Sequence, residues 1–489
     1  MHMTRPLELF IESDGRRWDG VFIGKISGRE AISQLFSFDV DLVLIDALVD
    51  LDQCAVVGLD VSIVFELEGV EVRRVHGLIA RVIDKLEMPG DHRGYRLTIQ
   101  PRLVRMSLIE TQEIFLDLSI PQIIERKLEM HGFVPRDYEL RLLAAYAPRE
   151  MVVQYGETDV AFLARLTEHL GISFFFEHES GIDKVIFTDH PAGFSRVEGG
   201  DEALFHGRGE TMGVSELHLV KEMIPARYFV QDYNYRTPLL DPTGSFEADP
   251  NGDGGVVEYG SHVKSPEEAT RLAQIRAEER VCRRNVYRAK TTHLPTSAGR
   301  RLTLLDHPRL DPRQDFLVVE IEHDGHFPLV GGESDKPIFQ SRFSAITSDI
   351  AYRPPRRTPK PKMYGFVTGV IQPGPQGEIG GVAKLTDDGR YTVQVHFDTA
   401  VRGQQKASHP VRMAQPFAGH GNSMHFPLLP GTEVVLAFAN GDPDRPIIVG
   451  ALPNPVSPTV VVDDEAHTHR IRSSQGVVIE FGNTVPGRS

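Results

Sequence analysis

The first group of residues whose types and spacing could bind a ligand resembles a calcium-binding loop. Residues 249–254, Asp-Pro-Asn-Gly-Asp-Gly, copy the first half of an EF-hand loop, with side-chain oxygens at alternate positions and a glycine at the sharp turn. The twelfth position, which should supply a bidentate glutamate, is Gly260, and Glu258 comes two residues early. The pattern therefore favours a polar surface loop over a calcium site.

Two pairs of histidines have spacings that a transition metal could use. His178 and His190 lie near the two ends of an expected hairpin and could face each other, but two imidazoles without a third ligand seldom hold zinc. His467 and His469 stand on one face of an expected strand, and three such strands around a threefold axis could hold a metal. We expect ordinary strand residues at both pairs, and the sequence alone does not decide whether His467 and His469 bind a metal.

Motifs of nucleophilic or phosphate chemistry do not occur in the sequence. It has no Gly-x-Ser-x-Gly elbow, no P-loop and no His-Glu-x-x-His motif. Cys54 and Cys282 lack a local nucleophile signature, and two cysteines cannot build a disulfide framework, which favours folding in a reducing cytoplasm. We expect no catalytic residue, no cofactor and no metal, so the chain is predicted not to be an enzyme.

The net charge argues against one class of partner, and the distribution of apolar residues bears on the route by which the protein could leave the cell. The net charge is −15, with 68 acidic and 53 basic residues, which argues against nucleic acid as a partner because phosphate binding relies on clustered cations. Residues 1–17 show no apolar core or cleavage site of a signal peptide, and no stretch reaches the roughly 18 apolar residues of a membrane span. We expect a protein made in the cytoplasm that does not leave by the general secretory signal.

The elements that would position these residues are mostly strands. The chain has 489 residues, 40% of them apolar, with 44 glycines and 33 prolines, which predicts about three domains of ~150 residues with many turns. Alternating or apolar runs predict strands at 8–13, 36–44, 61–68, 75–83 and 95–100, and a hairpin over 172–190. Ser119 and Ser265 have the spacing of helix caps, and a helical face over 157–170 ends at Gly171.

Two proline-rich seams divide the chain. Residues 353–362 form a basic, extended run that we interpret as a solvated linker, with a binding patch as the alternative, and residues 454–458 form the second seam. The predicted domains are an N-terminal region over 1–352, the linker over 353–362, a compact unit over 363–453 and a tail over 454–489.

The compact unit has the pattern of a small OB-type barrel. Tyr391, Val393, Val395 and Phe397 alternate with polar residues, and a second strand is expected over 432–438. Asn440-Gly441 predicts a tight primed turn, because both residues tolerate positive φ, and Pro446 is expected to open the next strand. The aromatic residues alternate as core residues do, so the barrel is predicted not to bind nucleic acid.

The amino-acid sequences of several segments resemble those of one protein family. Gly-Asp-Pro-Asp-Arg-Pro-Ile-Ile-Val-Gly at 441–450 is similar to the signature of the VgrG spike proteins of bacterial type VI secretion, which resemble the hub and spike of contractile phage tails. Segments 28–36, 75–79, 411–419 and 424–427 agree with the same family, so the resemblance runs from about residue 8 to residue 481. One departure is Pro410, which stands where the family usually has a tryptophan shortly before the strand at 411.

The resemblance implies a fold and a mechanical function. The fold is mainly β with some α: a hub of β-barrel-like domains and helices, an OB-type barrel, and the start of a triple-stranded β-prism. The implied protein is a homotrimer that caps the tube of Hcp rings, carries a PAAR-repeat tip protein and effectors or their adaptors, contacts baseplate components, and is secreted by the apparatus. The residues that carry the spike signature are then structural, not catalytic: Val411, Arg412, Gln415, Pro416, Gly441, Asp442, Pro443, Asp444, Arg445, Pro446 and Gly450.

Two other functions fit parts of the sequence. The hub and spike of a phage or of an extracellular contractile injection particle has nearly the same physics, whereas a cell-wall hydrolase would need a lysozyme-like domain beside the barrel. Segments 460–463, 467–472 and 477–481 look like the first strands of the prism, which we expect to be ordered only in a trimer. The opening Met1-His2-Met3 and the early end at Ser489 suggest a deliberately shortened chain, with a naturally short spike as the alternative.

Overall fold

The structure is a computed structural model that describes most of the chain. It describes residues 7–44, 56–86, 93–197, 200–206, 212–328, 337–373, 378–379, 382–383, 385–399 and 408–482, so Met1–Met3, Cys54 and Ser489 lie outside the described residues. The chain divides into two compact units: Met1–Glu110, Ser119–Ala147 and Thr158–Pro359 form the first, and Thr111–Leu118, Pro148–Glu157 and Lys360–Ser489 form the second. The predicted domain limits themselves stay a prediction.

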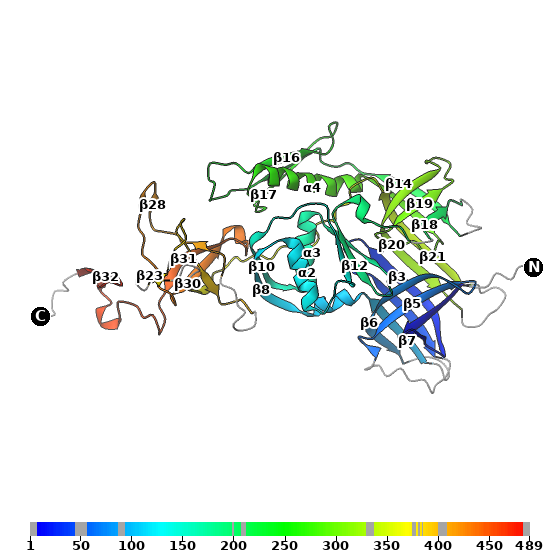
Figure 1. The fold of residues 1–489 in the computed structure, drawn as a ribbon, viewed down its shortest axis with the longest axis horizontal. Coiled ribbons are helices and arrows are strands. Elements are labelled where there is room, and N and C mark those ends of the chain that lie inside the picture. Colours follow the sequence, from blue (N-terminus) through cyan, green and yellow to red (C-terminus); the bar gives the residue numbers. More distant parts are fainter. Residues whose placement is uncertain are drawn as a thin grey trace, which may run out of the picture. The chain divides into compact units, whose positions relative to one another are not determined.

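A 13-stranded sheet is the framework of the first unit, with the blue β3–β7 strands beside the green β20 and β21 in Figure 1. All of its strand pairs are antiparallel except β13–β19. Its strands, in spatial order, are β14 (Val214–Lys221), β18 (Asn285–Thr291), β21 (Ile338–Thr347), β20 (Arg313–His326), β3 (Val21–Ala31), β4 (Ser37–Leu44), β7 (Arg93–Gln100), β6 (Val70–Lys85), β5 (Asp60–Leu67), β1 (Leu7–Ser13) and β2 (Arg16–Arg17), with β19 (Arg301–Leu305) on β20 and β13 (Glu202–Leu204) on β19.

Alternation along each strand explains why one face of this sheet is buried. In β4 the side chains of Phe38, Val40 and Leu42 are 0–1% exposed, whereas Asp39 and Asp41 point to the opposite face. The inward residues of β1 and β3–β7 form one apolar cluster, and those of β18–β21 form a second. The five predicted N-terminal strands are confirmed.

Two helices begin at predicted caps, and a third ends at a predicted glycine. Helix α2 (Ile120–Met130) starts with a capping box between Ser119 and Gln122, as predicted. Helix α3 (Asp159–Leu170) ends at Gly171, whose φ of 69° suits a glycine C-cap. Helix α4 (Pro266–Arg284) is capped by Ser265. No helix in the described part of the chain is long and apolar enough to cross a membrane.

Two small sheets complete the first unit. The predicted hairpin is present as β11 (Ser173–Glu177) and β12 (Lys184–Thr188), with β9 (Tyr138–Arg141) beside β12. The other sheet packs against α4 and contains β16 (Gly244–Glu247), β15 (Arg227–Gln231) and β17 (Gly255–Tyr259). Short 3-10 helices span Arg102–Leu108 and Pro191–Gly193.

The second unit is built around a small, strongly buried core. Its strands are β26 (Val393–Val395), β22 (Val367–Ile371), β30 (Glu433–Phe438) and β31 (Pro446–Leu452) in one sheet, and the pairs β25 (Arg390–Tyr391) with β27 (Val411–Arg412), β23 (Glu378–Ile379) with β24 (Val382–Ala383), and β28 (Ala418–Gly419) with β29 (Asn422–Ser423). Tyr391, Val393 and Val395 are buried, as the alternation predicted.

Two strands that precede this core by more than 200 residues also belong to it. They are β8 (Glu110–Leu118) and β10 (Arg149–Thr158), which pair with each other. Their side chains Ile114, Met151 and Val153 lie in the same apolar cluster as the barrel residues. The barrel core is therefore assembled from three separate stretches of chain.

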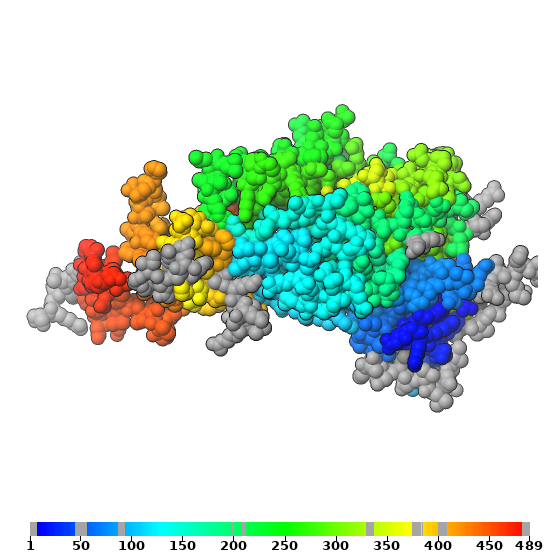
Figure 2. Space-filling model, viewed as in Figure 1, coloured from blue at the N-terminus to red at the C-terminus, as the bar shows by residue number. Residues whose placement is uncertain are grey.

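Two parts of the second unit expose apolar side chains. The β28–β29 arm, a narrow orange finger in Figure 2, leaves Phe417 and Phe426 about half exposed. In the tail, a short 3-10 helix at Asp463–Glu465 precedes the pair β32 (Thr468–Arg472) and β33 (Val478–Gly482). Ile471 and Phe481 of this pair are exposed, as expected for strands with too few apolar side chains for a core.

Candidate functional site

The signature segment forms the loop between β30 and β31. Asn440 and Gly441 have φ values of 56° and 70°, and the N–H of Asp442 donates to the carbonyl of Ala439 at 3.0 Å. This is a β-turn with positive φ at both central residues, as the primed turns require. The positive φ predicted for Asn440-Gly441 is confirmed.

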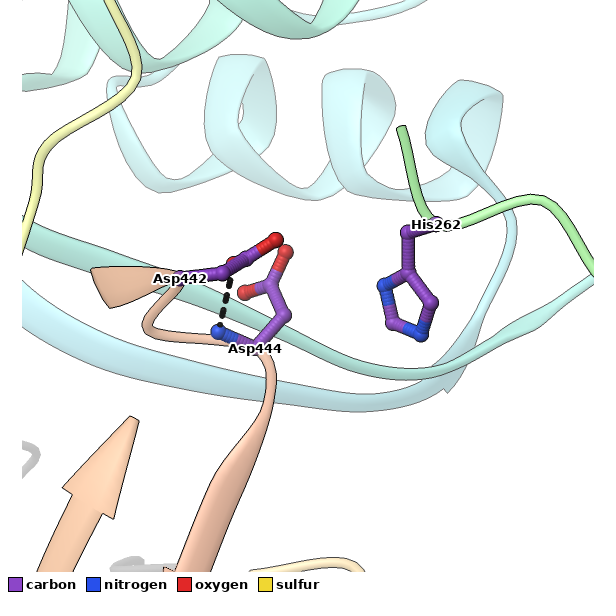
Figure 3. A group of neighbouring side chains, drawn as sticks. All are labelled: His262, Asp442 and Asp444. Carbon is purple, nitrogen blue, oxygen red and sulfur yellow. Dashed lines mark hydrogen bonds between the residues drawn. The ribbon is translucent and has the colours of Figure 1, made fainter. Parts of the chain in front are cut away.

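The loop is nevertheless longer than a tight hairpin turn. Phe438 pairs with Pro446, so seven residues lie between the strands. The second turn places Pro443 at its first central position, and the N–H of Arg445 donates to the carbonyl of Asp442 at 2.9 Å. The Asp442 side chain accepts the N–H of Asp444 at 2.9 Å, the bond drawn in Figure 3. This side-chain hydrogen bond stabilises the second turn, so the loop consists of two consecutive turns.

A lysine joins the two acids of the loop. Lys360 Nζ lies 2.5 Å from Asp442 Oδ1 and 2.6 Å from Asp444 Oδ2, and Asp442 is only 6% exposed. The other oxygen of Asp444 accepts the N–H of Val153 at 2.7 Å. The loop therefore ties β10 to the beginning of the stretch that follows Pro359.

This arrangement fits a structural role better than acid–base chemistry. Both carboxylates lie within ion-pair distance of the Lys360 ammonium, and the second oxygen of Asp444 is occupied by the Val153 N–H, so neither acid is free to face a substrate. The backbone is held as well, because the N–H of Met363 donates to the carbonyl of Gly441 at 2.9 Å. His262, also labelled in Figure 3, belongs to the first unit and donates its N–H to Asp232 at 2.6 Å.

The remaining signature residues occupy different places in the second unit. Val411 is a core residue on β27, and Arg412 pairs across the strands with Arg390. Gln415 Nε2 lies 3.2 Å from His425 Nδ1. Pro416 is exposed in the arm, and Gly450 lies beside the irregularity in the β30–β31 register. The structure thus gathers residues 441–446 into one loop but not the whole set.

The structure separates the acids and histidines that had metal-like spacings. Asp249 forms an ion pair with Arg284 at 2.8 Å and accepts the N–H of Asn251, as in a surface turn. His178 and His190 follow opposite ends of the β11–β12 ladder, so they do not face each other. In the described part of the chain, none of these residues, nor His467 or His469, belongs to a group of three potential metal ligands.

The basic run after Tyr352 is not a free, solvated linker. Arg353 donates to Glu278 at 2.7 Å and to the carbonyls of Gly171 and Asp189 at 3.0 and 2.7 Å. The Glu168 carboxylate accepts the N–H groups of Arg357 and Thr358, both at 2.9 Å. The solvated-linker interpretation was wrong for this segment, because helix ends and buried acids of the first unit supply partners that are distant in sequence.

Sequence reasoning missed a buried polar group in the main sheet. His323 Nδ1 lies 2.7 Å from Ser341 Oγ, and His323 Nε2 lies 2.7 Å from Glu30 Oε1. Arg73 forms an ion pair with Glu30 and donates to the carbonyls of Leu294 and Thr296. The one available signal was that Glu30 falls on an inward position of β3, in phase with Ile26.

The chain of contacts from Ser341 through His323 to Glu30 has the residue types of a catalytic triad, but its geometry argues against one. In a triad the Nε2 atom faces the serine and Nδ1 faces the acid, which is the reverse of the arrangement at His323. Ser341, His323 and Glu30 are 2, 3 and 7% exposed, so a substrate could not reach them. Burial alone would raise the pKa of Glu30, but Arg73 and the hydrogen bond from His323 outweigh it and lower the pKa to about 2.

Comparisons with known proteins give two family matches in this chain. Residues 29–328 match the family "Phage tail baseplate hub (GPD)", and residues 379–452 match the "Type VI secretion system/phage-baseplate injector OB domain". The Pseudomonas aeruginosa type VI secretion system spike protein VgrG1c is 30% identical over 88% of this chain, and VgrG1a is 30% identical over 89%.

The chain is shorter than these relatives. It spans 59% of the length of VgrG1c and 68% of VgrG1a. Among solved structures, the E. coli c3393 protein, a type VI secretion component similar to the T4 tail proteins gp27 and gp5, superposes with a TM-score of 0.65 at 22% identity, covering 90% of this chain and 99% of that one. This likeness shows a shared fold.

Proposed function

The chain belongs to the VgrG family of type VI secretion spike proteins, and we propose that it is the hub and spike of a contractile injection apparatus. The observation that carries the proposal is the double family match: a hub match over 29–328 and an injector OB match over 379–452 occur in one chain, in that order. The resemblance predicted from residues 441–450 and the mainly β fold are confirmed.

The proposed mechanism is mechanical. The chain acts as a homotrimer that caps a tube of Hcp rings, contacts baseplate components, and carries a PAAR-repeat tip protein and effectors or their adaptors. It is assembled in the cytoplasm and delivered by the apparatus when a sheath contracts. The exposed β32–β33 pair supports the trimer, because a lone two-stranded pair is marginal in water and gains from pairing between chains.

The same proposal assigns no catalytic residue to the chain. The relatives VgrG1c and VgrG1a are named spike proteins, and the acids of the signature loop are held by Lys360 and the backbone. The buried row of Ser341, His323 and Glu30 has the wrong orientation and no access. Peptidoglycan zymography and an esterase screen test this point, and robust turnover by the purified chain would contradict it.

Assembly and secretion can be tested separately. Light scattering and native mass spectrometry at increasing concentration should show a trimer, with the tail at 460–482 becoming protected from protease only in that form. A strictly monomeric chain with an ordered tail would overturn the assembly proposal. In a type VI strain, a chimera in which this chain replaces the matching part of the resident spike protein should still release the tube protein, and failure with a properly assembled trimer would contradict the secretion role.

A further inference from the structure

An uncharged stretch of the second unit is exposed at the surface. Residues 413–432, which contain the β28–β29 arm, include no aspartate, glutamate, lysine or arginine, although charged residues make up 25% of the chain. Most residues of this stretch are exposed. Solvated loops normally carry charges, whereas the centres of protein–protein interfaces are depleted in charge and enriched in aromatic and methionine side chains. The composition of this stretch is therefore that of a surface covered by another protein chain.

The β28–β29 arm, visible as a narrow finger in Figure 2, is too small to be stable by itself. Phe417, Met424 and Phe426 are 57, 48 and 51% exposed, so its apolar side chains are not packed into the barrel core. Among the strands that the structure describes, β28 and β29 pair only with each other, and the N–H of Met424 extends the pair by donating to the carbonyl of Phe417 at 3.0 Å. A lone two-stranded pair is at best marginally stable in water, so the arm gains from a second surface to pack on.

The four-stranded sheet of the same unit has a second uncovered apolar surface. In β30 the side chains of Val434 and Leu436 point into the core, and Val435 between them points to the opposite face. An antiparallel sheet with one face on a core usually carries polar side chains on its other face. Here that other face, which we call the outer sheet face, is mostly apolar. Its half-buried residues include Val370, Val435 and Ile447, and its exposed residues include Phe366, Val449 and Leu452, which are 73, 43 and 39% exposed.

We propose that the β28–β29 arm of one copy of this chain packs on the outer sheet face of the next copy. Both surfaces belong to the same unit, so each copy gives its arm to one neighbour and receives the arm of the other, a head-to-tail contact that can close into a ring of three. The uncharged arm offers no counter-ion, so only an apolar surface can receive it without burying an unpaired charge. Glu433, at the start of β30 on the outer sheet face, already accepts a hydrogen bond from Asn454 at 3.0 Å. The inference rests on the proposed homotrimer and adds the two surfaces by which its copies bind.

Disulfide cross-linking of the full chain tests this contact. Phe426→Cys in the arm is combined with Val449→Cys or Phe366→Cys on the outer sheet face, in a Cys54→Ser background, because the other native cysteine, Cys282, is buried. Oxidation with copper phenanthroline should convert at least one of the two pairs into covalent dimers and trimers on a non-reducing gel, while each single variant runs as a monomer. Cross-linking by Phe426→Cys alone would show that the arms meet each other and would overturn the proposal.

Dissociation of the trimer, followed by analytical ultracentrifugation, provides an independent measurement. Phe417→Ser and Phe426→Ser should each raise the concentration at which the trimer half-dissociates about tenfold or more, because an apolar contact is lost at all three interfaces. Leu239→Ser is the control, since Leu239 is a fully exposed residue of the first unit, and it should leave this concentration unchanged.

The melting temperature of the dilute monomer should be the same for the native chain and both arm variants. A clear decrease would show that the arm packs within its own chain and would overturn the inference. A trimer that forms without these cross-links and tolerates both arm variants would also overturn it, but would leave the proposed homotrimer standing. A chain that stays strictly monomeric would overturn both.

Discussion

Separating the barrel from β8 and β10 should unfold it. Residues 360–489 contain most of the second unit, but its core also holds Ile114, Met151 and Val153, which are 3, 6 and 1% exposed. Burying one such side chain contributes about 1.5–3 kcal/mol, so the three together contribute about 5–9 kcal/mol. The whole stability of a small domain is roughly 5–15 kcal/mol, so a fragment without these strands has little left.

Polar contacts add to this loss. The N–H of Val153 satisfies Asp444, and the N–H of Thr399 donates to the carbonyl of Gln112 at 2.9 Å. The rings of Tyr155 and Phe397 also meet edge to face, with centroids 5.2 Å apart. Without β8 and β10, Asp444 would keep only part of its set of partners.

Urea unfolding followed by circular dichroism tests this reasoning. A fragment of residues 360–489 should show no cooperative transition, and adding a peptide of residues 148–157 should restore part of one. The same peptide with Val153→Asp is the matched control and should fail, because it would bury a charge in the apolar core. A fragment that unfolds cooperatively at the midpoint of the second unit in the full chain would refute the argument.

Three further predictions concern single positions. Gly441→Val places a β-branched residue at a φ of 70° and should cost about 1–3 kcal/mol in thermal or urea unfolding, whereas Gly450→Val, where space is open, should cost much less; equal effects would contradict the turn geometry. Asp159→Ala removes a carboxylate 2.9 Å from the fully buried Lys127 ammonium and should cost about 3–5 kcal/mol, and an unchanged midpoint would show that Lys127 needs no such partner. Because the pKa of Glu30 is lowered to about 2, its stabilising effect is complete above a pH of about 4.5 and is lost as the pH falls towards 2. Glu30→Gln should therefore flatten the dependence of unfolding free energy on pH in that window, and an unchanged slope would argue against the ion pair.

Local signals in the sequence predicted much of the secondary structure correctly. The capping box at Ser119, the glycine stop at Gly171 and the cap at Ser265 all depend on bonds between residues three or four apart. The positive φ of Asn440 and Gly441 is likewise a property of those residue types. The limits of the loop that contains them were also predicted correctly, since the strands end at Phe438 and begin again at Pro446. Its second turn depends in addition on the Asp442 side chain.

Contacts between distant segments could not be predicted in this way. Nothing near Glu30 in sequence indicates that Arg73 and His323 neutralise it, since the partners lie on two other strands. From the sequence alone, the basic run at 353–358 is predicted to be solvated. In the structure, Glu168 of α3 and Glu278 of α4 lie beside it and accept its hydrogen bonds. Alternation shows that a side chain points inward but not what it meets there.

The sequence by itself determined which stretches become strands, helices and turns, because backbone preferences and alternation act over a few residues. It also determined the family, through the sequence of residues 441–450 and the other segments that are similar to the same family. Only the tertiary structure decided that β8 and β10 complete the barrel core and that Lys360 joins Asp442 to Asp444. Burial and charge pairing depend on distances in space, and strands far apart in the chain become neighbours only when the sheet forms.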